Sequence, residues 1–174
     1  MGVVMNPARL GQIVGVTAVM VAVQATTAYA WVHFGNANLT AKDGSTVVAS
    51  GTAGDMRVGW YQLAGRNYSS ANYSFTDRAP GNGRNAYAEV LAYHEYVYWL
   101  PMPGGGSTPK IGTSYAASGF SSRVSSSWSG TVSSTWAPAA YIGVGAIFRI
   151  CEDAPLWPDN CGAVNKYVSA QNYS

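Results

Sequence analysis

Carboxylates are the first residues of this sequence that could do chemistry, because pairs of them act as acid and base in many extracellular hydrolases. Glu89 and Glu95 would share a face if segment 86–100, AYAEVLAYHEYVYWL, were one strand. Six residues along a strand span about 20 Å, whereas the carboxyl groups of a glycosidase lie roughly 5 to 10 Å apart. Glu152 and Asp153 are adjacent, so a strand would point them to opposite faces. The spacing therefore predicts no catalytic pair of carboxylates.

Histidine, serine and glycine motifs are equally scarce. The chain has two histidines, His33 and His94, and no Gly-x-Ser-x-Gly sequence, so nothing singles out a serine for a catalytic triad. The two histidines give no metal-binding spacing. The glycines at 104–106 are followed by neither the Lys-Ser pair nor the helix start of a phosphate-binding loop. We therefore expect a protein that is not an enzyme, with no catalytic residues, no metal and no cofactor.

Aromatic residues make up 13% of the chain and suggest binding instead. The odd positions of segment 86–100 alternate rings with carboxylates: Tyr87, Glu89, Tyr93 and Glu95. On a solvated strand face, rings could stack on a ligand while carboxylates accept its hydrogen bonds. The alternative is that the rings form the core and its borders. These four residues are the candidate ligand-binding residues.

Segment 86–100 can itself be read in two ways. A helix would place Tyr87, Leu91 and Tyr98 on one stripe. Four Tyr, two Val and a Trp favour a strand instead. An extended segment of this length would span about 50 Å, far more than the roughly 15 Å radius of gyration of a domain this size. We therefore expect a strand that bends, bulges or splits.

Two cysteines lie near the end of the chain, after a clear strand pattern. From Ile142 to Ile150 every second residue is apolar, which predicts a strand with one buried face. Cys151 follows directly, and Cys161 comes ten residues later, after two prolines. Two cysteines in an exported chain are most simply one disulfide. No histidine lies near enough to make them a zinc site.

The N-terminus has the features of a signal peptide that forms a helix. Arg9 precedes an apolar run at 13–23, and Ala28-Tyr29-Ala30 has the small-x-small form of a cleavage site. A retained membrane anchor is the alternative, but the run is far shorter than the roughly 20 residues that span a bilayer. Cleavage after Ala30 would leave residues 31–174 as a single secreted, extracellular domain.

The charge balance narrows the partners. The whole chain has a formal net charge of +2, and only 10% of its residues are charged, against about 25% in ordinary soluble domains. A balance so near zero gives no reason to expect nucleic acid or, after removal of the signal peptide, a membrane as partner.

Short strands separated by turn sequences fill the remainder. We expect strands at 46–50 and 55–63, with a turn at 51–54, and a mobile loop at 79–85. The period-two pattern of 123–136 suggests a hairpin with a three-residue loop at Ser129–Thr131, which would keep Trp128 and Trp136 inside. A last short strand would fall in 163–170. This pattern predicts an all-β fold, a two-sheet antiparallel sandwich that is immunoglobulin-like in outline.

Three short stretches carry a resemblance. NAYAEV at 85–90, FRICED at 148–153 and WPDNC at 157–161 resemble small, uncharacterised secreted proteins of actinomycetes. The resemblance covers roughly the second half of the predicted mature chain. It implies export, a β-rich domain and a Cys loop near the C-terminus, and it brings no activity.

The sequence thus favours a secreted, non-enzymatic protein that binds a polysaccharide, a cell surface or another secreted protein. A secreted inhibitor or toxin-like protein is the second hypothesis, and a projecting rigid loop such as 151–161 would favour it. A small extracellular hydrolase is the third, and it would need His33 or His94 beside a carboxylate and a serine.

Overall fold

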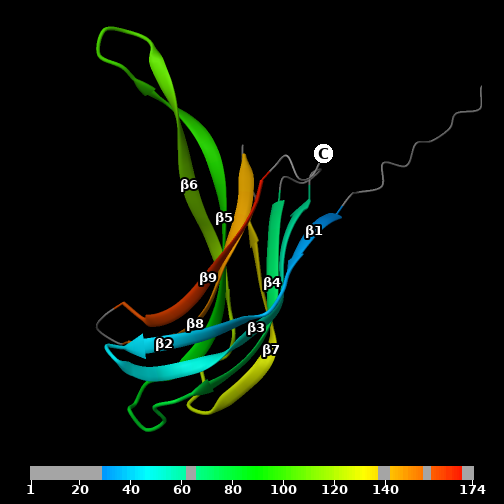
Figure 1. Ribbon diagram of the computed structural model, residues 1–174, viewed down its shortest axis with the longest axis vertical. Helices are drawn as coiled ribbons and strands as arrows, with labels where there is room; N and C mark the ends of the chain where they lie inside the picture. The colour runs from blue at the N-terminus through cyan, green and yellow to red at the C-terminus, as the bar shows by residue number, and fades with distance from the viewer. Residues whose placement is uncertain (1–28, 62–65, 137–141, 155–157, 170–174) are drawn as a thin grey trace, which may run out of the picture.

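The computed structural model describes residues 29–61, 66–136, 142–154 and 158–169. These residues form strands and no helix, in two antiparallel sheets that pack face to face (Figure 1). The strands are β1 (Tyr29–Phe34), β2 (Ala37–Asp43), β3 (Thr46–Tyr61), β4 (Arg66–Asp77), β5 (Ala86–Pro101), β6 (Ser107–Phe120), β7 (Ser127–Trp136), β8 (Gly143–Glu152) and β9 (Asn160–Ser169). The predicted two-sheet sandwich is confirmed.

The predicted signal peptide falls almost wholly outside the described residues, and strand β1 begins at Tyr29. No helix among the described residues is long and apolar enough to cross a membrane.

The larger sheet has the order β1-β3-β4-β7, with β2 paired to β3 as well. Strands β1 and β2 share one edge of β3, because Phe34 pairs with Met56 and Ala37 pairs with Ala53. The smaller sheet has the order β6-β5-β8-β9. Strand β5 is therefore an inner strand of the smaller sheet, flanked by β6 and β8.

Strand β3 corrects the expected pair of strands with a turn at 51–54. It is one strand whose register with β4 shifts between Gly54 and Arg57. Asp55 takes a positive φ of 46° at this bulge. Its carboxylate accepts hydrogen bonds from Arg57 and from the His33 ring. These contacts hold the pKa of Asp55 below its usual value. A side-chain cluster thus stabilises a bend that the sequence suggested was a turn.

Strand β7 corrects the expected hairpin at 123–136. It runs straight from Ser127 to Trp136 and pairs with β4 along its length, with Val132 opposite Ala71. Gly130 is no turn residue. A side chain there would collide with the Trp128 ring, since a Cβ would lie 2.8 Å from it. The period-two alternation belongs to a single strand, and that strand pairs with β4, which is distant in the sequence.

The core lies between the sheets and is lined by the even positions of β5 and β8. In β8, Val144, Ala146, Phe148 and Ile150 are fully buried, as the alternation predicted. They pack in one cluster with Val90 of β5 and with residues of β2, β3, β4 and β7. Since successive strand residues point to opposite faces, the odd positions of β5 must lie on the outer side of the smaller sheet.

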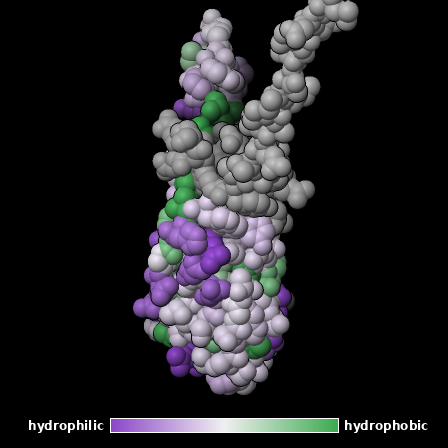
Figure 2. Space-filling model, turned by 90° about the vertical axis from the view of Figure 1, so that its right-hand side faces the viewer, coloured by the Kyte–Doolittle hydropathy of each residue, from purple (hydrophilic) through white to green (hydrophobic). Residues whose placement is uncertain are grey.

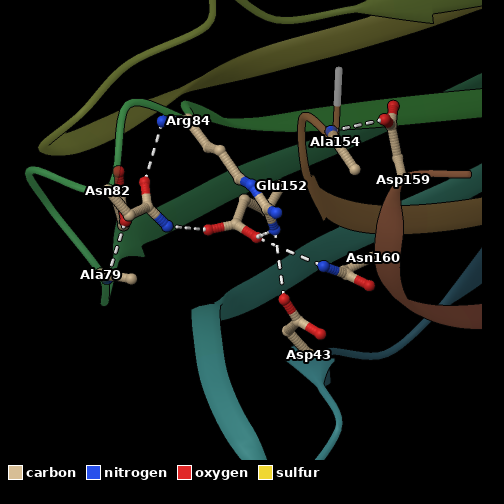
Figure 3. A network of polar contacts seen from close by, with 9 residues as sticks. Asp43, Ala79, Asn82, Arg84, Glu152, Ala154, Asp159 and Asn160 are labelled. Carbon is tan, nitrogen blue, oxygen red and sulfur yellow. Dashed lines mark hydrogen bonds and ion pairs between the residues drawn. The ribbon is translucent and has the colours of Figure 1, made fainter. Parts of the chain in front are cut away.

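Segment 79–85 is a loop, as the sequence predicted, and a buried acid holds it by hydrogen bonds. Glu152, with no exposed surface, accepts hydrogen bonds from Asn82 at 2.6 Å and from Arg84 at 3.3 Å (Figure 3). The Asn82 side-chain oxygen, Oδ1, accepts in turn from the Arg84 backbone N–H. The loop therefore closes over the carboxylate at the end of β8.

The same acid connects two further parts of the chain. Glu152 also accepts from Asn160 of β9 at 3.3 Å, and Arg84 reaches Asp43 of β2 at 3.1 Å (Figure 3). A buried charge is tolerated when it is paired and hydrogen-bonded in this way. Glu152 and the adjacent Asp153 are thus engaged in structure, as Arg123 binds Asp153.

The predicted disulfide is confirmed. Cys151 and Cys161 are opposite each other on β8 and β9, with Cα atoms 4.1 Å apart. The bond therefore staples the two strands at the end of their hairpin.

The segment at 86–100 is a strand, as its composition predicted, and its length is accommodated in two ways. Its pairing with β6 is irregular between Leu91 and Tyr93, where β6 holds an extra residue. Its pairing with β8 ends at Glu95, and within the described part of the chain residues 96–101 pair with β6 alone. The upper part of the β5–β6 hairpin therefore projects from the sandwich (Figure 1).

Candidate binding face

The outer face of the smaller sheet carries all four candidate ligand-binding residues. Tyr87, Glu89, Tyr93 and Glu95 occupy odd positions of β5, so they share this face as the alternation predicted. The expectation that the rings are solvated is wrong. Tyr87, Glu89 and Tyr93 are only 3%, 2% and 4% exposed, and Glu95 is half-buried.

Tyr87 is covered at the lower end of the face by side chains from elsewhere. Phe120 of β6 lies 6.0 Å from its ring, and the Arg123 guanidinium lies 4.7 Å above it. Its hydroxyl donates to Asp159, and burial together with this hydrogen bond raises the pKa of Tyr87. Phe120 is itself half exposed, so it is the ring that solvent meets here.

Glu89 lies at the middle of the face and is neutralised there. It is opposite Arg149 of β8, and the two side chains form an ion pair. Burial alone would lower the pKa of Arg149, but the Glu89 carboxylate outweighs it and raises that pKa. The Glu89 carboxylate is thus engaged by the Arg149 guanidinium within the sheet.

A row of tyrosines crosses the upper end of the face. Tyr115 of β6, Tyr93 of β5, Gly145 of β8 and Tyr167 of β9 are successive cross-strand partners. The Tyr93 and Tyr115 rings lie 5.7 Å apart. The outer two tyrosines are exposed, Tyr115 by 59% and Tyr167 by 41%. The row thus has one buried ring between two accessible ones.

Glycines of β8 let these rings lie against the sheet. A Cβ on Gly145 would come within 2.4 Å of the Tyr93 ring, and one on Gly143 within 2.0 Å of the Tyr167 hydroxyl. The Tyr93 hydroxyl donates to Asn165 at 2.8 Å. Burial and the hydrogen bond to Glu95 raise the pKa of Tyr167 to about 12. We call Tyr93, Tyr115 and Tyr167 the tyrosine row; it is held in place before any ligand arrives.

The two histidines are not brought together. His33 bonds Asp55 at the bend of β3, in the larger sheet. His94 is on the core side of β5, where burial lowers its pKa. In the described part of the chain, the His33 ring hydrogen-bonds to Asp55 and not to a serine. No group of three His, Cys, Asp or Glu side chains among the described residues could hold a metal ion.

The sequence did not indicate Phe120, Tyr115 or Tyr167. Strand β6, which holds Phe120 and Tyr115, begins in a Gly/Pro-rich stretch and alternates poorly, with an extra residue at 116–117. Tyr167 was inside the expected last strand, but nothing in one sequence tells which face that strand turns to solvent. The signal that could have found them is an aromatic residue directly opposite an outward-facing position of β5 or β8. Recognising it requires the strand order.

Comparison with protein-family models, with curated proteins and with solved structures gave no match to this chain. The resemblance to secreted actinomycete proteins therefore stays a prediction.

Proposed function

We propose that this protein is an exported, non-enzymatic binding protein that holds a glycan, such as a polysaccharide or the carbohydrate of a cell surface, along the outer face of its smaller sheet. The observation that carries the proposal is the tyrosine row: Tyr115 and Tyr167 are exposed, and the glycines of β8 leave room for the Tyr93 and Tyr167 rings to lie against the sheet. Sugar rings present apolar faces, and a preorganised flat ring can stack on one at little entropic cost.

Polar groups stand beside the exposed rings in the way that a sugar ligand requires. Glu95 and Asn165 lie at the hydroxyls of Tyr167 and Tyr93, where they can accept or donate hydrogen bonds at the edge of a stacked ring. The ion pair of Glu89 and Arg149 makes the middle of the face polar. A face of this mixed character suits a hydroxylated ligand better than an apolar one.

The face offers a second contact along the strand. Phe120 is level with Glu89, and Tyr115 is level with Tyr93, four residues further along β5. That separation is about 13 Å. One monosaccharide cannot bridge it, so the arrangement favours an extended chain that touches both rings.

The test is retention of the protein on insoluble polysaccharides and on whole cells. Tyr115→Ala and Tyr167→Ala should each weaken retention by about tenfold, the loss expected when a stacking contact is removed. Tyr115→Phe keeps the ring and should retain most of the binding. Val47→Ala, an exposed apolar residue of the larger sheet, is the control.

Retention that is equal in wild type, Tyr115→Ala and Tyr167→Ala would contradict the proposal. So would failure of the wild-type protein to bind any of a broad set of polysaccharides. Melting temperatures of the same proteins show whether a loss reflects unfolding, which is not expected for rings that are exposed.

A further inference from the structure

The projecting part of the β5–β6 hairpin, residues 96–112, is the most apolar exposed region among the described residues; we call it the arm. Six of its side chains are large, apolar and exposed, namely Val97, Tyr98, Trp99, Leu100, Met102 and Ile111. Trp99 and Ile111 are each more than 60% exposed. In the space-filling view the hairpin stands above the rest of the described surface, with hydrophobic residues along it (Figure 2).

The apolar side chains lie on both faces of the arm. Val97 and Trp99 point to one side, and Ile111 joins them because it is the cross-strand partner of Val97. Tyr98 and Leu100 point to the other side. A protein partner with one docking surface would cover only one of these faces. A lipid layer into which the arm dips would surround both.

Charge on the arm matches a phospholipid surface. Between residues 96 and 112 the only charged side chain is Lys110, and there is no carboxylate. The phosphates of a bilayer surface attract cations and repel carboxylates. Trp and Tyr are also the residues that favour the boundary between lipid headgroups and acyl chains.

The backbone limits how deep the arm can go. Beyond Glu95, strand β5 pairs with β6 alone among the described residues, so the arm is a two-stranded ribbon with open edges. Unpaired N–H and C=O groups are not tolerated in the hydrocarbon layer. The arm is therefore suited to shallow insertion, with the turn at 102–106 and the rings near it in the interfacial layer.

We propose that the arm is a lipid-contacting element that inserts its tip into the interfacial layer of a phospholipid bilayer. This goes beyond glycan binding and rests on different residues. The near-zero net charge of the whole chain gave no reason to expect a membrane partner. That sum does not show that one segment, the arm, is apolar and nearly uncharged.

The test is flotation of the protein, recovered from culture medium, with vesicles of phosphatidylcholine, with and without phosphatidylglycerol. Wild type should float with both. The double variant Trp99→Ser/Leu100→Ser should lose at least about tenfold in bound fraction, because two side chains no longer enter the lipid. Met102→Ser, in the turn, should also weaken binding and serves if the double variant does not fold.

The matched control is the same substitution on either side of the molecule. Val97→Ser on the arm should reduce flotation, and Val47→Ser on the larger sheet should not, although both valines are exposed. Flotation lost equally in both would contradict the proposal, as would wild type that stays with neither vesicle. A wild-type dimer that Trp99→Ser/Leu100→Ser dissociates, without flotation, would instead assign the arm to a second copy of this chain. Unchanged polysaccharide retention in the arm variants separates this proposal from the glycan site.

Discussion

The two halves of strand β5 have similar composition and opposite surroundings. Residues 86–95 are largely buried, and residues 89–95 pair with both β6 and β8. In the described part of the chain, residues 96–101 pair with β6 alone, and residues 97–101 are exposed. Each half is rich in aromatic and aliphatic residues. The difference lies in their neighbours: Phe120, Arg123 and Arg149 cover the first half, whereas strand β8, which begins at Gly143 opposite Glu95, does not flank the second. The same kind of sequence thus builds a packed half, residues 86–95, which we call the platform, and a free arm.

The largest effect is expected from removing a ring of the platform. Tyr93→Ala should lower the free energy of unfolding by about 3 to 5 kcal/mol, as for other large-to-small changes at buried positions. The substitution also removes the hydroxyl that donates a hydrogen bond to the Asn165 side chain. Urea denaturation measures the change. A loss below about 1 kcal/mol would show that the ring is not packed as the structure places it.

Breaking the central ion pair should cost somewhat less. Glu89→Ala leaves Arg149 without its partner, and we expect a loss of about 2 to 4 kcal/mol, below the range for a fully buried pair because Arg149 is partly exposed. The matched change is Glu95→Ala at the last residue before the arm, where the carboxylate is half-buried and the loss should be smaller. Equal losses in the two variants would contradict the difference in burial between the two carboxylates.

A smaller effect follows from His94, at the upper end of the packed half. Burial lowers its pKa in the folded protein, so the unfolded chain binds the proton more readily. Stability should therefore fall as pH drops below about 6.5, the ordinary histidine value. His94→Gln removes this titration and should flatten the dependence between pH 7 and 5. A wild-type stability that rises on acidification through this window contradicts the burial of His94.

The smallest effect on stability is expected on the arm. Trp99→Ala should change the free energy of unfolding by less than about 0.5 kcal/mol, since its side chain is largely exposed and makes little packing contact. Thermal melts beside Tyr93→Ala provide the contrast. A large destabilisation would mean that Trp99 is packed in solution, and the arm would no longer be a free surface.

The sequence predicted what depends on local alternation. The buried face of β8 follows from period-two patterning, the strand at 86–100 from its composition, and the Cys151–Cys161 disulfide from the cysteine count. It failed where a distant strand decides. Gly130 read as a turn because its partner Tyr73 in β4 could not be known, and Asp55 read as the start of a strand because the His33 contact is remote.

The candidate site shows the same limit more sharply. Alternation placed Tyr87, Glu89, Tyr93 and Glu95 on one face, but burial of that face depends on side chains from β6, β8 and β9. Tyr115 and Tyr167 are the accessible rings of the row, and the room on β8 is taken by Tyr93 at Gly145 and by Tyr167 at Gly143. Strand order, which periodicity does not encode, decides which aromatic rings meet solvent.

Amide hydrogen exchange along β5 tests most directly the claim that one strand divides into a packed platform and a free arm. Amides between Glu89 and Tyr93 should exchange only on global unfolding, at a rate that falls as stability is raised. Amides between Val97 and Leu100 should exchange much faster through local opening of the two-stranded ribbon. Uniform protection across both halves would contradict the account, because the arm would then be covered and neither surface could be assigned as proposed.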